Sequence, residues 1–236
     1  MRKLKKIAAL LAAGTCLTST LTGCSKVADE IITSLVQWNL DSVYLNQHNE
    51  TYLKMVDLTA EEAKNNYDEG IQLDAENFAY YWGITDDVHV TYADLDTELQ
   101  NDIFNLCSTI SQKAKYVVQS AAAQDDGSYA VKVVVEPIDI IEQANTMYNE
   151  DTYEPLSTFW SKYEESDYTD MTTEDYIAIS NEYGTLMVQM VEELLPNLGY
   201  MEEKSLNIQL EEVNDLWEIN EDDLETFYEY VVSYPY

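Results

Sequence analysis

The residues that usually carry enzymatic chemistry are few in this chain and stand far apart. It contains two histidines, His48 and His89, and three cysteines. None of them has the paired spacing of a zinc site, and no Gly-x-Ser-x-Gly motif is present. Cys107 follows Ile103 by one turn on the apolar face of a predicted helix, which predicts a small buried side chain rather than a nucleophile. The sequence therefore predicts no nucleophilic catalysis and no metal centre.

Carboxylates are abundant, but their positions do not single out a site. The chain has 45 Asp and Glu residues. Paired carboxylates can hydrolyse glycosides, yet at this density some pair falls at a suitable separation by chance. Asp125-Asp126-Gly127-Ser128 lacks the alternating oxygens of a calcium loop and is typical of a hairpin turn. Asn220-Glu221-Asp222-Asp223 fits a helix N-terminus, where the dipole favours acids. We expect no catalytic residues and no cofactor, and only weak, diffuse binding of divalent cations.

Aromatic side chains are the remaining candidates for ligand contact. The chain has 19 tyrosines and four tryptophans, and Tyr80-Tyr81-Trp82 is the densest cluster. Trp82 belongs to the apolar stripe of its predicted helix, whereas Tyr80 and Tyr81 lie off that stripe. Exposed aromatics beside carboxylates can bind sugars or peptides, so Tyr80 and Tyr81 are the predicted ligand contacts for a protein, peptide or glycan. Most other tyrosines are expected to bury the ring and expose the hydroxyl.

The first 23 residues have the layout of a secretory signal. Basic residues within Met1–Lys6 precede an apolar run, Ile7–Leu17, which is shorter than the roughly 20 residues of a membrane-spanning helix. Leu21-Thr22-Gly23-Cys24 resembles the lipobox of bacterial lipoproteins, in which the cysteine receives a diacylglycerol and becomes the first residue. An ordinary signal peptidase needs small residues at −1 and −3, and Leu21 is too large. We expect a signal peptide over 1–23, lipidation of Cys24, a tether over 24–26, and anchoring on the extracytoplasmic face of the cell membrane.

Charge excludes some partners of the expected mature chain. The four basic residues of the signal leave with it, so eight lysines remain against 45 acidic residues, a formal charge of −37, and no arginine remains. Backbone binding of nucleic acid needs many cationic contacts, so we exclude that partner. Because one cysteine leaves with the signal and Cys24 is acylated, Cys107 has no disulfide partner.

Apolar spacing predicts an α+β fold: helices packed on a four-stranded antiparallel sheet made of two hairpins. Helices are expected over about 27–47, 59–82, 92–113, 139–164 and 173–195, with a last helix after Asn220. Pro155 should interrupt the fourth helix and Pro196 should end the fifth, while Thr59 and Thr172 should cap their helices.

Period-two alternation predicts hairpins over 115–136 and 206–219, the second turning at Asn214-Asp215. Trp217 shares parity with Ile219, so we expect it to be buried between sheet and helices. The helices–hairpin order occurs twice, which suggests two similar halves, about 27–138 and 139–236, within one acidic domain over 27–236.

Several short motifs carry a resemblance to known proteins. They are Tyr67-Asp68-Glu69-Gly70, Lys113-Ala114-Lys115-Tyr116, Val135-Glu136-Pro137-Ile138-Asp139 and Trp217-Glu218-Ile219-Asn220-Glu221-Asp222-Asp223-Leu224. Over most of the expected mature chain the sequence resembles lipoproteins of Gram-positive bacteria whose domains have no assigned function. The last hairpin is similar to that of NTF2-like (cystatin-like) domains, although the two long helical stretches between the hairpins depart from that layout. The resemblance implies an anchored α+β domain and brings no active-site residues.

Three functions are consistent with the sequence. The leading hypothesis is a membrane-anchored, non-enzymatic binding or scaffolding domain. The alternatives are an extracellular hydrolase that uses carboxylates, and a solute-binding lipoprotein that serves a transporter. The last is disfavoured because the strand–helix alternation of two α/β lobes is missing.

Overall fold

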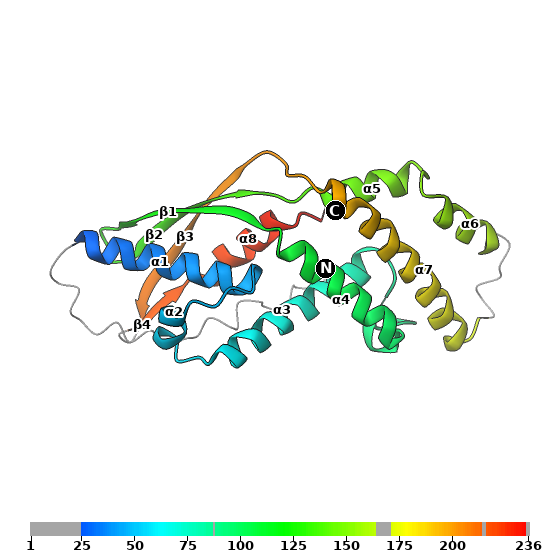
Figure 1. The fold of residues 1–236 in the computed structure, drawn as a ribbon, viewed down its shortest axis with the longest axis horizontal. Coiled ribbons are helices and arrows are strands. Elements are labelled where there is room, and N and C mark those ends of the chain that lie inside the picture. The colour runs from blue at the N-terminus through cyan, green and yellow to red at the C-terminus, as the bar shows by residue number, and fades with distance from the viewer. Residues whose placement is uncertain (1–24, 87, 164–170, 214–215, 235–236) are drawn as a thin grey trace. The chain divides into compact units, whose positions relative to one another are not determined.

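The computed structural model describes residues 25–86, 88–163, 171–213 and 216–234, and confirms the α+β class (Figure 1). The helices are α1 (Ser25–Tyr44), α2 (Glu50–Met55), α3 (Ala60–Tyr81), α4 (Thr97–Ser111), α5 (Ile140–Asn149), α6 (Glu154–Tyr163), α7 (Thr173–Leu194) and α8 (Glu221–Val231). The strands are β1 (Lys115–Ala123), β2 (Tyr129–Glu136), β3 (Lys204–Val213) and β4 (Leu216–Ile219). None of the helices in these ranges is both long and apolar enough to cross a bilayer.

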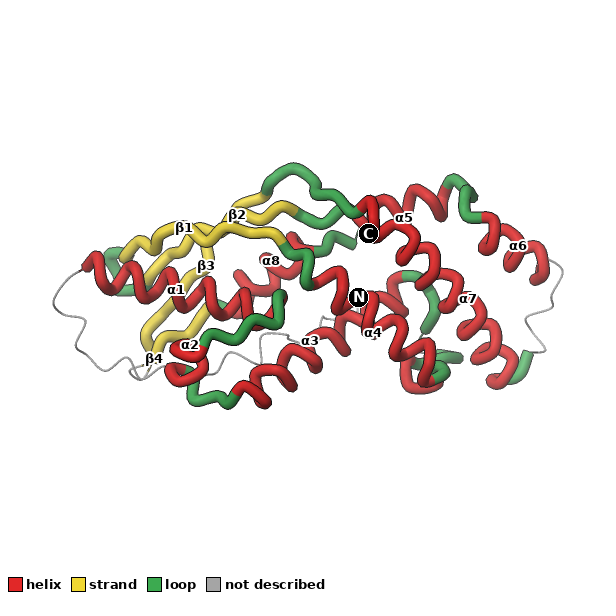
Figure 2. Tube along the Cα trace, viewed as in Figure 1, coloured by secondary structure: helices red, strands yellow, loops and turns green. Residues whose placement is uncertain are grey.

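The four strands form one antiparallel sheet in the order β1-β2-β3-β4 (Figure 2). The second hairpin joins the first through β2 and β3, where Val131 lies opposite Ile208. Alternate residues of these strands are buried, which is the period expected for a sheet with one face on a core. The register shifts between Val118 and Ala121, and the amide of Ala121 donates to Oγ1 of Thr33 on α1 at 2.8 Å. A side chain of α1 thus satisfies the backbone at this irregularity.

The chain divides into two compact units, and both are discontinuous in sequence. The sheet unit comprises residues up to Gly70, Ser111–Ile138 and Tyr200–Val232, and the helical unit comprises Ile71–Ile110, Asp139–Gly199 and the C-terminal residues from Ser233. Each unit draws segments from both of the expected halves, 27–138 and 139–236. The compact units are therefore not those halves, and the suggested duplication stays a prediction.

In the sheet unit, α1 packs on β1 and β2, and α8 packs on β2 and β3. Phe227 of α8 is fully buried, and its ring meets the edges of Tyr44 and Tyr116 at 5.2 and 5.5 Å. These contacts join both helices to the sheet around one aromatic centre. α2 was not predicted: it has only six residues, and the side chain of Asn49 caps it by accepting from the amides of Thr51 and Tyr52.

In the helical unit, α5 and α6 pack against α7. α7 begins at the predicted capping box, in which the side chain of Thr172 accepts from the amide of Asp175 and the Asp175 carboxylate accepts from the amide of Thr172. The predicted helix over 139–164 is two helices, as Pro155 indicated. Pro155 stands at the second position of α6, where a missing amide proton costs little.

The prediction that Trp217 is buried is wrong, because its side chain is only partly buried. Its side chain is half-buried, with the ring edge 5.2 Å from Tyr129. β4 is an edge strand of the sheet, and Trp217 lies opposite exposed Glu212 rather than an apolar residue. The predicted turn at Asn214-Asp215 lies outside the described residues.

Candidate functional site

The residues singled out from sequence lie in different surroundings. Cys24 falls outside the described residues. Tyr80 is 46% exposed, whereas Tyr81 is half-buried, with its hydroxyl accepting from Nδ2 of Asn145 at 2.6 Å. The ring of Tyr81 also meets the rings of Trp82 and Tyr234, at 5.0 and 4.8 Å. Their role as ligand contacts stays a prediction, and Tyr80 is the more accessible of the two.

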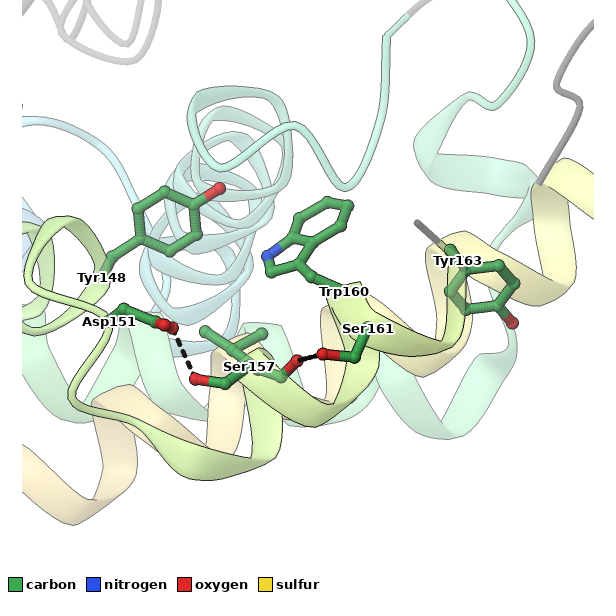
Figure 3. Close-up of a pocket in the computed structure, with 7 residues that line it drawn as sticks. Tyr148, Asp151, Ser157, Trp160, Ser161 and Tyr163 are labelled. Atoms are coloured by element: carbon green, nitrogen blue, oxygen red, sulfur yellow. Dashed lines mark hydrogen bonds between the residues drawn. The ribbon is translucent and has the colours of Figure 1, made fainter. Parts of the chain in front are cut away.

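A pocket lies in the helical unit at the junction between α5 and α6 (Figure 3). Its volume is about 590 Å³, within the range of roughly 300–1,000 Å³ typical of small-molecule sites. The lining combines aromatic rings, hydroxyls and one carboxylate: Tyr148, Asp151, Leu156, Ser157, Trp160, Ser161 and Tyr163. None of these residues was predicted from sequence to be a site residue.

The end of α5 places Asp151 at the pocket. The amide of Asp151 donates to the carbonyl of Tyr148, and the amide of Thr152 donates to that of Met147. This is the Schellman pattern that closes many helices, and glycine usually occupies its left-handed position. Asp151 holds that position with φ of 51°, a conformation that Asp tolerates better than most residues but at some cost. The geometry thus keeps a carboxylate where a glycine would fit more easily.

The carboxylate of Asp151 also ties the two helices together. Oδ1 of Asp151 accepts a hydrogen bond from Oγ of Ser157, in the first turns of α6. Ser161 lies one turn further along α6, and its Oγ donates to the carbonyl of Ser157 at 2.9 Å. Residues four apart in a helix share a face, so both serine side chains follow the same side of α6.

Trp160 provides the open aromatic surface of the pocket. Its side chain is 43% exposed, although it packs on Phe159 at 5.0 Å and on Tyr183 at 5.4 Å. Phe159 is buried, so it anchors Trp160 from behind. Figure 3 shows Tyr148 and Trp160 facing a common space, with Asp151 and Ser157 below it. The indole nitrogen lies on the edge of Trp160 that is nearer to Tyr148.

Tyr148 lies beside Trp82 and Tyr183. The hydroxyl of Tyr183 donates to the carbonyl of Trp82 at 2.9 Å. A carbonyl oxygen can only accept, so the single hydroxyl proton of Tyr183 goes to Trp82. Burial raises the pKa of Tyr183, which therefore stays protonated at neutral pH. The Tyr148 ring lies 5.9 Å from that of Trp82.

An ion pair fixes the far end of α6. Nζ of Lys162 lies 2.6 Å from Glu182 on α7, and the hydroxyl of Tyr163 donates to the same carboxylate at 3.0 Å. The hydrogen bond from Lys162 lowers the pKa of Glu182. In Figure 3 the Tyr163 hydroxyl points away from Trp160. Tyr163 thus closes one end of the pocket but directs its polar atom elsewhere.

Other reactive groups lie outside the pocket. Cys107 is buried, as predicted, and burial raises the pKa of its thiol, which keeps it protonated. The carboxylate of Asp86 accepts from Nδ1 of His89 and from the amides of Val88, His89 and Val90, and these bonds hold its pKa far below the usual range. Among the described residues, no three His, Cys, Asp or Glu side chains form a group that could hold a metal.

Comparisons with known proteins identify a shared fold but no family. No family model matches the chain, and no curated protein matches it. The crystal structure of a "putative lipoprotein" (YcdA) from Bacillus subtilis strain 168 is similar, with a TM-score of 0.54 and 13% sequence identity. The match covers 89% of this chain and 60% of that one, so the chain matches only about three-fifths of the Bacillus protein. At this identity the likeness shows the fold alone. The similarity to NTF2-like domains stays a prediction.

Proposed function

We propose that this chain is a lipoprotein, held by acylated Cys24 at the extracytoplasmic face of the membrane, that binds a small ligand in the α5–α6 pocket. The pocket of Tyr148, Asp151 and Trp160 is the observation that carries the binding role. The Leu21-Thr22-Gly23-Cys24 motif and the similarity in fold to a "putative lipoprotein" support the anchor.

The chemistry of the lining favours binding over hydrolysis. Asp151 is the only carboxylate among the described lining residues, whereas glycoside hydrolysis by carboxylates uses two that flank the scissile bond. Ser157 donates its proton directly to Asp151, without the imidazole that activates a serine nucleophile in a triad. The arrangement can orient a ligand by stacking and hydrogen bonding. These features support the proposed binding role over a hydrolytic one.

Thermal denaturation of the full chain with a panel of primary amines, neutral disaccharides and tripeptides tests this role. We expect at least one class to raise the Tm of the wild type, because a ligand that binds only the folded state stabilises it. Trp160→Ala should abolish that rise. Tyr200→Ala removes an aromatic of similar exposure, 38%, from the sheet unit and should retain it.

Equal stabilisation of Trp160→Ala and wild type would place the ligand elsewhere and refute the assignment of this pocket. Mass spectrometry of the recovered panel separates the two classes of function. Unchanged compounds are expected, and cleaved glycosides or peptides would favour the hydrolase.

A further inference from the structure

We infer that the α5–α6 pocket takes an organic ammonium ion, a protonated amine attached to an apolar or aromatic body. The inference rests on the proposed function, because it names the ligand class of that same pocket. It follows from where the hydroxyl protons of the lining residues go, from the open face of Trp160 and from the charge around the pocket.

Two hydroxyl protons of the lining are directed into the protein. Ser157 donates to Asp151, and Ser161 donates to the carbonyl of Ser157. Each hydroxyl has one proton and two lone pairs. The oxygens of Ser157 and Ser161 therefore keep only acceptor capacity for a ligand, and the carboxylate of Asp151 adds more.

Among the described lining residues, a ligand in this pocket thus meets the serine acceptors and the one negative charge of Asp151. An ammonium group has three donors and no acceptor, so it matches that set. Hydrogen bonds between an ammonium and a carboxylate are among the stronger ones in proteins. A neutral sugar also needs donors from the protein, and among the described polar groups of the lining the indole N–H of Trp160 and the hydroxyl of Tyr148 are the ones left to supply them.

The aromatic walls fit the remainder of such a ligand. Trp160 exposes part of its ring, and Tyr148 faces the same space (Figure 3). Aromatic faces attract cations and also pack against apolar groups. A ligand that joins an amine to a ring or a short hydrocarbon would contact the rings of Trp160 and Tyr148 and the carboxylate of Asp151 at the same time.

The charge distribution favours the same class of ligand. The chain carries a formal charge of −33, and a field of this sign raises the local concentration of cations and repels anions. Lys162 is the basic residue of α6, but both oxygens of Glu182 accept from its ammonium group, at 2.9 and 2.6 Å. Lys162 is therefore paired with α7 and does not neutralise Asp151.

Calorimetric titration of the full chain with two probes of the same shape tests the inference. The probes are 2-phenylethylamine, which is protonated at neutral pH, and 2-phenylethanol, which is neutral. The full chain is kept in solution with a polyoxyethylene detergent. The headgroup of this detergent carries neither a sugar nor a cation that would compete with the probes. We expect the amine to bind at least about tenfold more tightly than the alcohol, the factor that corresponds to one charge-assisted hydrogen bond.

Asp151→Asn should weaken binding of the amine about tenfold and leave binding of the alcohol unchanged. Asn adopts left-handed backbone at least as readily as Asp, so the turn is retained. Asp126→Asn is the matched control, because Asp126 also accepts from a serine hydroxyl, that of Ser128, but in the β1–β2 turn of the sheet unit. It removes the same charge and should change the affinity for the amine by less than about twofold.

The outcomes separate the ligand class from the proposed function. Equal affinity for the two probes, failure of the amine to bind, or equal weakening by Asp126→Asn would overturn the ammonium assignment. Trp160-dependent binding of a neutral sugar in the thermal panel would overturn it too, while leaving the binding function intact. If Trp160→Ala does not weaken binding of the amine, both the ammonium assignment and the proposed binding function of this pocket are overturned. A further titration with the methylamide of N-acetyl-lysine distinguishes a free amine from a lysine side chain in a peptide.

Discussion

At the scale of single residues, Asp151 adopts an unfavourable left-handed backbone conformation and places a carboxylate in the pocket. Asp57 occupies the same left-handed position after α2, with φ of 51°, and there the amide of Leu58 donates to the carbonyl of Leu53. Two aspartates thus close helices by the same motif, but only Asp151 is among the lining residues of the pocket. The pair makes it possible to measure the backbone cost of Asp151 separately from its role.

Replacing either aspartate by glycine should stabilise the fold, because glycine adopts this conformation without a steric penalty. We expect Asp57→Gly to raise the free energy of unfolding by about 1 kcal/mol. Asp151→Gly should raise it by less, since the hydrogen bond from Ser157 is lost. Binding of 2-phenylethylamine should weaken only in Asp151→Gly. Denaturant melts beside the titrations measure both effects, and a large destabilisation by Asp151→Gly would mean that the carboxylate has a structural role.

Cys24 is the residue on which the proposed membrane anchor depends. Cells grown with a clickable palmitate analogue should label the wild-type protein, because the thiol of Cys24 is the expected acceptor of the lipid. Cys24→Ala should not be labelled. Cys107→Ala is the control, since Cys107 is buried and should not affect labelling. Equal labelling of Cys24→Ala and wild type would rule out this anchor.

Trp217 and Phe227 test how burial sets the cost of losing an aromatic. Phe227 is fully buried, so Phe227→Ala should cost about 3–5 kcal/mol of stability. Trp217 is half-buried beside Tyr129, so Trp217→Ala should cost about half as much, roughly 1.5–2.5 kcal/mol. Denaturant unfolding of the two variants gives the comparison. An equal loss in both would mean that Trp217 belongs to the core after all.

At the scale of elements, two helical glycines should respond in opposite ways to alanine. A Cβ at Gly184 in α7 would lie 2.8 Å from Leu99 and 2.9 Å from Ile84, whereas at Gly70 in α3 no atom lies within 4 Å. Alanine favours a helix by about 1 kcal/mol over glycine, so Gly70→Ala should stabilise by about that amount. Gly184→Ala should destabilise by about 1–3 kcal/mol, because the helical unit is packed closely there. Thermal melts of both variants decide this, and stabilisation in both would show that the neighbours of Gly184 can move.

Most helices and strands were predictable because their signals, helix caps and the spacing of apolar residues, are local in the sequence. Thr59 and Thr172 cap the helices they were expected to cap, and β2 and β3 alternate as sheet strands should. The six-residue helix α2 shows no periodic stripe, and the expected helix over 92–113 is a 3₁₀ turn, Tyr92–Asp94, followed by α4.

The pocket was not predictable in the same way. It depends on the left-handed turn at Asp151. An aspartate at that position does not by itself predict such a turn. The pocket also depends on α6 folding back against α7, which is a tertiary contact. Pro155 and the aromatics on either side of it were the available signal, since a helix break flanked by Tyr148 and Trp160 brings two rings toward one space.

At the scale of the whole molecule, self-repulsion should limit stability. Eight lysines cannot neutralise 45 acids in the expected mature chain, and salt screens charges over about 10 Å at 0.1 M. We expect the Tm to rise with sodium chloride and to rise further with millimolar calcium or magnesium. Calorimetry should detect no tight stoichiometric calcium site. A single site with submicromolar affinity would contradict this and direct attention to Asp125 or Asp222.

The pairing of β2 with β3 also governs when the protein can fold. These strands flank the whole segment Ile140–Asn197, so Val131 cannot meet Ile208 until that segment has been synthesised. Pairings between residues so distant in sequence form slowly, because the loop must close before its contacts stabilise it. A chain that is threaded unfolded across a membrane must not close its sheet before it has crossed. Late pairing of β2 with β3 is therefore compatible with the export that the predicted signal peptide implies.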